Sequence, residues 1–110
     1  MRLEFSPHIA FQVKDYQNAI RFYSEVMGMK LVELKEGESE FSVGPLTFYA
    51  EASDKGTVFF EFKTDDLETA MQEFVAAGCR LVPETTPEGH ASCYVYDPYG
   101  LVFHLFEEKS

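Results

Sequence analysis

The sequence has few basic residues and no long apolar run. Nine lysine and arginine residues stand against 19 aspartate and glutamate residues, a net charge of −10. Such a surface repels a phosphate backbone, so nucleic-acid binding is not expected. We interpret the charge mainly as a solubility feature, and attraction of cationic ligands is the alternative. No apolar stretch approaches the roughly 20 residues of a membrane span, and the first residues lead into no apolar signal segment. We therefore expect a cytoplasmic protein without membrane or nucleic-acid partners.

Cysteine and the common catalytic motifs are also scarce. The two cysteines, Cys79 and Cys93, have no metal-binding spacing, so free thiols in a reducing compartment are expected. The chain contains no Gly-x-Ser-x-Gly, no phosphate-binding glycine loop and no Cys-x-x-Cys. Acyl transfer, nucleotide binding and thiol redox chemistry therefore have no support in the sequence.

The chain repeats itself at half its length. At an offset of 51 residues, the segment 8–15 aligns with 59–66, and with one residue dropped Gly28 aligns with Gly78. A repeat of this length indicates two copies of one structural unit.

Each copy is predicted to fold as βαβββ, which gives an α+β fold. Period-two alternation predicts strands, a 3.6-residue period predicts helices, and Gly- or Pro-bearing segments predict turns. With 110 residues and 45% hydrophobic composition, we predict a single domain over 1–110, built from a module at about 1–53 and a second at about 54–110. The predicted strands are 8–13, 30–35, 40–43, 46–51, 57–63, 80–83, 91–96 and 101–107, and the predicted helices run from Asp15, as N-cap, to Gly28 and over 66–77.

Alternation in the strands also predicts which residues face away from the helices. Each helix covers one sheet face, so we expect the other faces of two curved mixed sheets to enclose a hollow. In the last strand Leu101, Phe103 and Leu105 are expected to pack under the second helix. Tyr94 and Tyr96 either add hydroxyls to the hollow or are ordinary strand tyrosines. The residues expected to line the hollow are His8, Ala10, Gln12, Thr47, Tyr49, Glu51, Phe59, Glu61, Lys63, Val102, His104 and Phe106.

Two motifs within the doubled pattern indicate a family. His-x-x-x-x-Val-x-Asp opens the first half at His8, and Asp-Pro-Tyr-Gly at 97–100 precedes the last strand. This arrangement resembles the vicinal-oxygen-chelate superfamily of glyoxalases, bleomycin-resistance proteins and extradiol dioxygenases. The resemblance covers essentially the whole chain and implies the glyoxalase/bleomycin resistance/dioxygenase-like fold. Because this fold hosts several chemistries, the resemblance does not select one activity.

The resemblance implies metal ligands at His8 and His104. The other two ligand positions of metal-using relatives fall on Phe59 and near Tyr49, which are aromatic. Glu61, two residues past Phe59, is one candidate for the missing carboxylate, and Glu51 is another. Two imidazoles and one carboxylate suit zinc, nickel, manganese or iron. In an aromatic pocket Glu61 would alternatively have a raised pKa and act as a general base.

Three interpretations follow from these residues. In the first, the chain is a lyase or isomerase-like small-molecule enzyme in which a divalent ion on His8 and His104 polarises adjacent substrate oxygens. In the second, it is a metal-free, bleomycin-resistance-like protein that sequesters an aromatic or cationic compound, and the histidines make ordinary hydrogen bonds, His104 with Glu61 or a tyrosine. In the third, the chain only dimerises. The resemblance implies a homodimer in each case. The residues predicted to contact a small-molecule ligand are Gln12, Tyr49, Phe59, Tyr94 and Phe106.

Overall fold

The computed structural model describes residues 2–85 and 89–108 and divides into two compact units. The first unit is Pro7–Phe59, and the second unit combines Met1–Ser6 with Phe60–Ser110. Residues 86–88, between the predicted strands 80–83 and 91–96, lie outside the described residues. Among the described residues, no helix has the length and apolar character to cross a bilayer.

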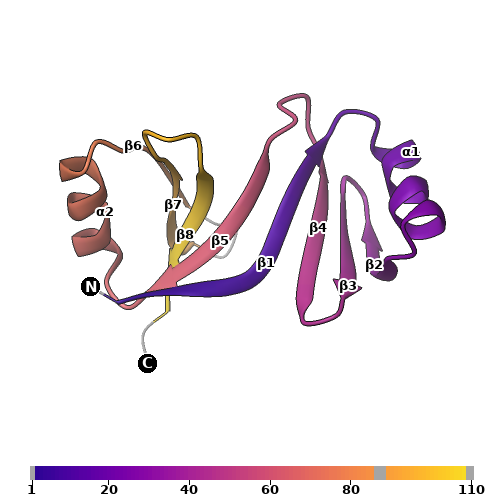
Figure 1. Cartoon of the computed structure of the whole chain (residues 1–110), viewed down its shortest axis with the longest axis horizontal. Helices are drawn as coiled ribbons and strands as arrows, with labels where there is room; N and C mark the ends of the chain where they lie inside the picture. Colours follow the sequence, from indigo (N-terminus) through magenta and orange to yellow (C-terminus); the bar gives the residue numbers. More distant parts are fainter. Residues whose placement is uncertain (1, 86–88, 109–110) are drawn as a thin grey trace. The chain divides into compact units, whose positions relative to one another are not determined.

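The first unit is a four-stranded mixed sheet with its helical segment on one face (Figure 1). Its strand order is β2-β3-β4-β1, with β1 and β4 parallel and the other neighbours antiparallel. This is the predicted βαβββ arrangement. Its elements are β1 (Leu3–Val13), α1 (Tyr16–Arg21), a π-helix η1 (Phe22–Val26), β2 (Lys30–Lys35), β3 (Glu38–Val43) and β4 (Leu46–Ala52).

The first helix differs from the prediction of one regular α-helix. Its second half widens into a π-helix, in which the Met27 N–H donates to the Phe22 carbonyl at 3.1 Å. The wider turn changes the angular phase of the residues that follow it. Val26 and Met27, which the 3.6-residue period places on the apolar face, are therefore exposed by 71% and 56%.

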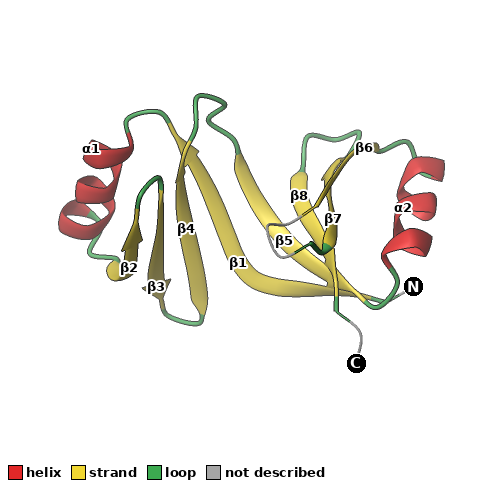
Figure 2. Cartoon of the chain, turned by 180° about the vertical axis from the view of Figure 1, so that it is seen from behind, coloured by secondary structure: helices red, strands yellow, loops and turns green. Residues whose placement is uncertain are grey.

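The second unit repeats the pattern with α2 against one face of its sheet (Figure 2). Its strand order is β5-β8-β7-β6, with β5 and β8 parallel. The elements that follow β4 along the chain are β5 (Val58–Thr64), α2 (Leu67–Ala76), β6 (Arg80–Thr85), β7 (Ala91–Tyr96) and β8 (Val102–Glu107).

The beginning of β1 also belongs to the second unit, where it runs alongside β5. The Arg2 N–H donates to Asp65 at 3.0 Å, and Lys63 Nζ pairs with Glu4 at 3.6 Å. Arg2 thus contacts Asp65, and Glu4 contacts Lys63, two residues earlier on β5. The residue numbers decrease along β5 as they increase along β1, so the two segments run antiparallel there. The predicted strand started at His8, and the structure extends it back to Leu3.

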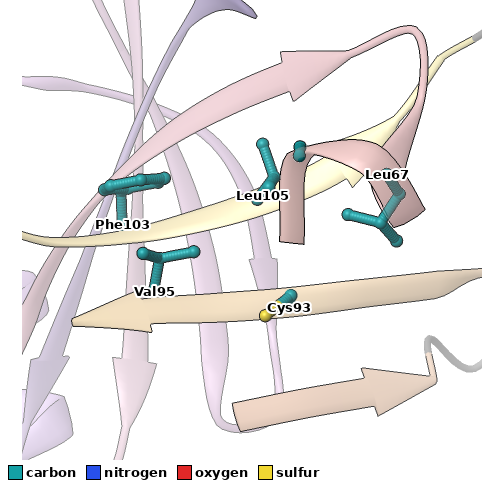
Figure 3. Packing of buried hydrophobic residues seen from close by; sticks show 6 residues of the cluster. Leu67, Cys93, Val95, Phe103 and Leu105 are labelled. Atoms are coloured by element: carbon teal, nitrogen blue, oxygen red, sulfur yellow. The ribbon is translucent and has the colours of Figure 1, made fainter. Parts of the chain in front are cut away.

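Each unit has its own apolar core between helix and sheet. In the second unit, the predicted residues Phe103 and Leu105 are buried with Leu67 of α2 (Figure 3). In the first unit, Phe41 and Ala50 are fully buried. The prediction for Leu101 is wrong: it is 38% exposed, and β8 starts one residue later. Its N–H donates to the Asp97 carboxylate at 2.8 Å, which keeps Leu101 in the turn before the strand.

The N-caps of the two helices give a stability prediction. The Asp66 side chain accepts the Thr69 N–H at 3.1 Å, whereas the Asp15 side chain makes no cap bond and accepts instead from the Asn18 amide at 2.7 Å. Asp66→Ala is therefore expected to lower the free energy of unfolding by about 1 kcal/mol. Asp15→Ala, the matched control, should cost clearly less because no backbone donor loses its acceptor. Urea unfolding compares them, and equal losses would contradict this account.

Candidate functional site

One row of side chains crosses three neighbouring strands of the second unit. Glu61 of β5 lies opposite His104 of β8, and His104 lies opposite Tyr94 of β7. Residues paired in this way project from the same face of a sheet. Their strand neighbours, such as Val95 and Leu105, belong to the core under α2. The row, Tyr94 included, therefore lies on the face opposite α2, which is the face expected to line the hollow.

Glu61 is held at both of its oxygens. The Ser6 hydroxyl donates to Oε1 at 3.1 Å, and Nδ1 of His104 lies 3.3 Å from Oε2. The side chains of His104 and Glu61 are 21% and 24% exposed, so both are sheltered but reachable from solvent. Ser6 itself is buried.

This geometry assigns the tautomer of His104. An ionised carboxylate can only accept hydrogen bonds, so a neutral imidazole beside Glu61 carries its hydrogen on Nδ1. The lone pair is then on Nε2. In the described part of the chain no hydrogen bond occupies Nε2, which leaves it for a ligand, a proton or a metal ion.

Aromatic rings flank His104. The ring centroid of Tyr94 lies 4.9 Å from that of His104, tilted by 47°, and Phe106 is near-parallel at 6.4 Å. Offset and stacked rings at these distances are favourable contacts. The Glu61–His104 pair therefore sits beside an aromatic surface.

The remaining predicted site residues lie in the first unit. The rings of His8 and Tyr49 meet edge to face, with centroids 5.5 Å apart. Gln12 has a buried Oε1 for which the described residues provide no hydrogen-bond partner. Phe59 is buried, 6% exposed. The structure therefore brings His8 to Tyr49 in this unit, and Glu61 to Tyr94, His104 and Phe106 in the other.

Neither unit by itself supplies a complete catalytic metal centre. Such a centre takes three protein ligands and an open position. The second unit offers one imidazole and one carboxylate, His104 and Glu61, and the first unit offers His8. Across residues 2–85 and 89–108, no group of three or more His, Cys, Asp or Glu side chains is arranged to hold an ion. The donor types fit a divalent metal, but within either unit the set is incomplete.

The cysteines do not contribute a nucleophile. Both are free, as predicted. Burial raises the pKa of the Cys93 thiol, and burial together with the charge of Asp97 raises the pKa of Cys79. A thiol needs a lowered pKa to be reactive at neutral pH, so both remain protonated.

Ser6 is the residue of this cluster that the sequence interpretation missed. The predicted first strand begins at His8 and leaves Ser6 outside any element. A signal for it is present before His8. The residues Leu3-Glu4-Phe5-Ser6 alternate apolar and polar side chains, as a strand with one buried face does.

Curated relatives are similar to this chain over more than nine-tenths of its length. A lactoylglutathione lyase of Arabidopsis thaliana is 30% identical over 121 residues, which covers 91% of this chain and 43% of that protein. A probable lactoylglutathione lyase of Vibrio parahaemolyticus is 29% identical and covers 93% of this chain and 89% of that protein. The chain thus spans less than half of the plant relative and most of the bacterial one.

A solved structure and a family model agree with these relatives. The Mn(II)-bound glyoxalase of Novosphingobium aromaticivorans superposes with a TM-score of 0.67 at 21% identity, covering 94% of this chain and 38% of that one, which supports the α+β fold predicted from the sequence. The family model matches residues 6–105. The chain therefore belongs to the Glyoxalase/Bleomycin resistance protein/Dioxygenase superfamily, as the sequence motifs indicated.

Proposed function

We propose that this chain is a glyoxalase-family lyase acting on a small molecule with oxygens on adjacent carbons, in the manner that the names of its lactoylglutathione lyase relatives indicate. The observation that carries the proposal is the contact of Glu61 with His104 on the sheet face opposite α2, 3.3 Å between Oε2 and Nδ1. The lactoyl group has a hydroxyl on the carbon next to its carbonyl, so lactoylglutathione is the probe we choose.

Proton transfer is the step that these residues can perform. The hydrogen on the hydroxyl-bearing carbon is acidified by the neighbouring carbonyl. Glu61 is assigned as the general base because its carboxylate contacts His104 on the face opposite α2 and is partly reachable from solvent. The proton passes from carbon to this carboxylate and is returned to the adjacent carbon, while the hydroxyl proton moves to the former carbonyl oxygen. The hydroxyl and the carbonyl thereby exchange places, and the hemithioacetal so formed releases the thiol as its carbon–sulfur bond breaks. Such catalysis typically supplies about 10²–10⁴-fold in rate.

A divalent ion would be held by His104 through Nε2 and by His8, and zinc, nickel, manganese and iron all suit imidazole ligands. When bound, such an ion polarises substrate oxygens as a Lewis acid. Glu61 would then be its third ligand or stay the base beside it. The side chains proposed to contact substrate are Gln12, Tyr49, Phe59, Tyr94 and Phe106.

Calorimetric titration of metal-stripped protein with zinc, nickel, manganese and iron tests the metal part of this proposal. His8→Ala and His104→Ala should each weaken metal binding at least about tenfold. His90→Ala replaces the exposed third histidine and is the matched control, which should bind as the wild type does. Unchanged affinity in both site variants, or no binding by the wild type, would remove the metal from the proposal.

The second candidate is a metal-free binding protein for an aromatic or cationic compound. The rings of Tyr94 and Phe106 next to that of His104 favour it. Under this alternative, a planar aromatic cation raises the melting temperature of metal-free protein, and no turnover of lactoylglutathione is found with any metal. Turnover that requires Glu61 would exclude it.

We propose, in addition, that the protein works in the cytoplasm, as expected from its lack of long apolar runs, and as a homodimer, as the family resemblance implies. Light scattering at low micromolar concentration measures the mass directly. A dimer is expected, and a monomeric mass would contradict this part.

A further inference from the structure

We propose that Ser6 is a positioning residue that fixes the Glu61 carboxylate and, through it, the Nδ1–H tautomer of His104. This inference rests on the proposed function, in which His104 works through Nε2. It concerns a residue that touches neither substrate nor metal in that proposal.

The argument starts from the two bonds on one carboxylate. Ser6 donates to Oε1 at 3.1 Å, and His104 Nδ1 lies 3.3 Å from Oε2. The terminal torsion of a glutamate side chain is broad and has no strong preference of its own. With a donor on each oxygen, rotation of the carboxylate would break both contacts. The Ser6 hydroxyl therefore keeps Oε2 directed at His104.

The hydroxyl of Ser6 is well placed for this role because it is sheltered. Ser6 is 5% exposed, so water competes little for its hydrogen bond to Glu61. At 3.1 Å the bond is longer than a strong hydroxyl–carboxylate bond, so the hydroxyl acts by directing the carboxylate more than by the strength of the contact. Loss of the hydroxyl would leave Oε1 without this donor.

The main chain at Ser6 is held by its neighbours rather than by its own side chain. Phe5 packs edge to face on Phe62, with centroids 5.6 Å apart, and Glu4 pairs with Lys63 at 3.6 Å. These contacts remain in a Ser6→Ala variant. We therefore expect that variant to fold and to lose the hydroxyl alone.

The consequence for His104 follows from how imidazole tautomers are set. Which ring nitrogen carries the hydrogen depends on the hydrogen bond that the other makes. When Oε2 of Glu61 is fixed, Nδ1–H is favoured and Nε2 keeps its lone pair. When the Ser6 hydroxyl no longer directs Oε2, His104 samples both tautomers, and part of the population presents N–H where a lone pair is needed.

Long-range proton–nitrogen NMR of the histidine rings tests this inference, since it reads the tautomer directly. The wild type at pH 8.5, where imidazole is ordinarily neutral, should show a protonated Nδ1 and an unprotonated Nε2 at His104. In Ser6→Ala the difference between the two nitrogen shifts should shrink as the tautomers mix, and Ser6→Thr should restore it. Ser92→Ala removes another buried serine of the second unit and is the control that should leave the shifts unchanged.

A wild-type tautomer in Ser6→Ala would overturn the inference, as would mixed tautomers in the wild type. In a turnover assay, Ser6→Ala should lower kcat about 10- to 100-fold with little change in KM. If the wild type shows no turnover, the proposed function fails, while the NMR result still decides whether Ser6 sets the tautomer.

Discussion

Glu61→Gln is expected to lower the turnover of lactoylglutathione about 10²–10⁴-fold while the protein remains folded. The amide has nearly the shape of the carboxylate but cannot take a proton, and its oxygen can still accept from Ser6. The contact with His104 needs to be rearranged, because the amide nitrogen would meet the Nδ1–H of His104 as a second donor. The measurement is kcat and KM of the purified variant beside its melting temperature.

Glu73→Gln is the matched control for this variant. Glu73 is exposed on α2, and α2 packs against the sheet face opposite the one that carries Glu61. The turnover of Glu73→Gln should therefore equal that of the wild type. Glu51→Gln discriminates between the two carboxylates that the sequence offered. If Glu51→Gln loses turnover and Glu61→Gln keeps it, the assignment of the base to Glu61 is wrong.

Leu105→Ala is expected to lower the free energy of unfolding by about 2–5 kcal/mol. Leu105 is fully buried between the sheet and α2, so truncation removes its apolar contacts and leaves a cavity among Leu67, Val95 and Phe103. That loss is a large part of the stability of a domain of this size. Urea unfolding followed by circular dichroism measures it.

Leu101→Ala is the control for this prediction on the same stretch of chain. Leu101 is the same residue type four positions earlier, but it is 38% exposed, so the loss should be about 0.5 kcal/mol or less. Strand alternation alone predicts similar losses for both residues. Equal losses would show that Leu101 is packed as the sequence pattern suggested and would contradict the structure.

The elements could be predicted from the sequence because their apolar periods agree with their packing. Strands β2 and β7 have the predicted bounds, and Phe103 and Leu105 face α2 as alternation requires. Predictions failed where a local hydrogen bond outweighs the period. Asp97 holds Leu101 in a turn, and the π-helix after α1 changes the phase of Val26 and Met27. Hydrophobicity contains no signal for either event.

The candidate site could be predicted only in part. Alternation predicts that Glu61 and His104 both face away from the second helix, in two strands of the same half of the repeat. The link to Ser6 depends on the pairing of β1 with β5, a contact between residues 55 positions apart. A single sequence, considered without an alignment, contains no information on which residues of two distant strands pair. The tautomer of His104, which follows from these contacts, was therefore beyond prediction as well.

The most direct test of the central claim is chemical-shift mapping of isotopically labelled protein during titration with lactoylglutathione. The account predicts that the largest changes fall on Glu61, His104 and Tyr94, on the face of the second unit's sheet opposite α2. Binding that shifts other residues and leaves these three unchanged would contradict it.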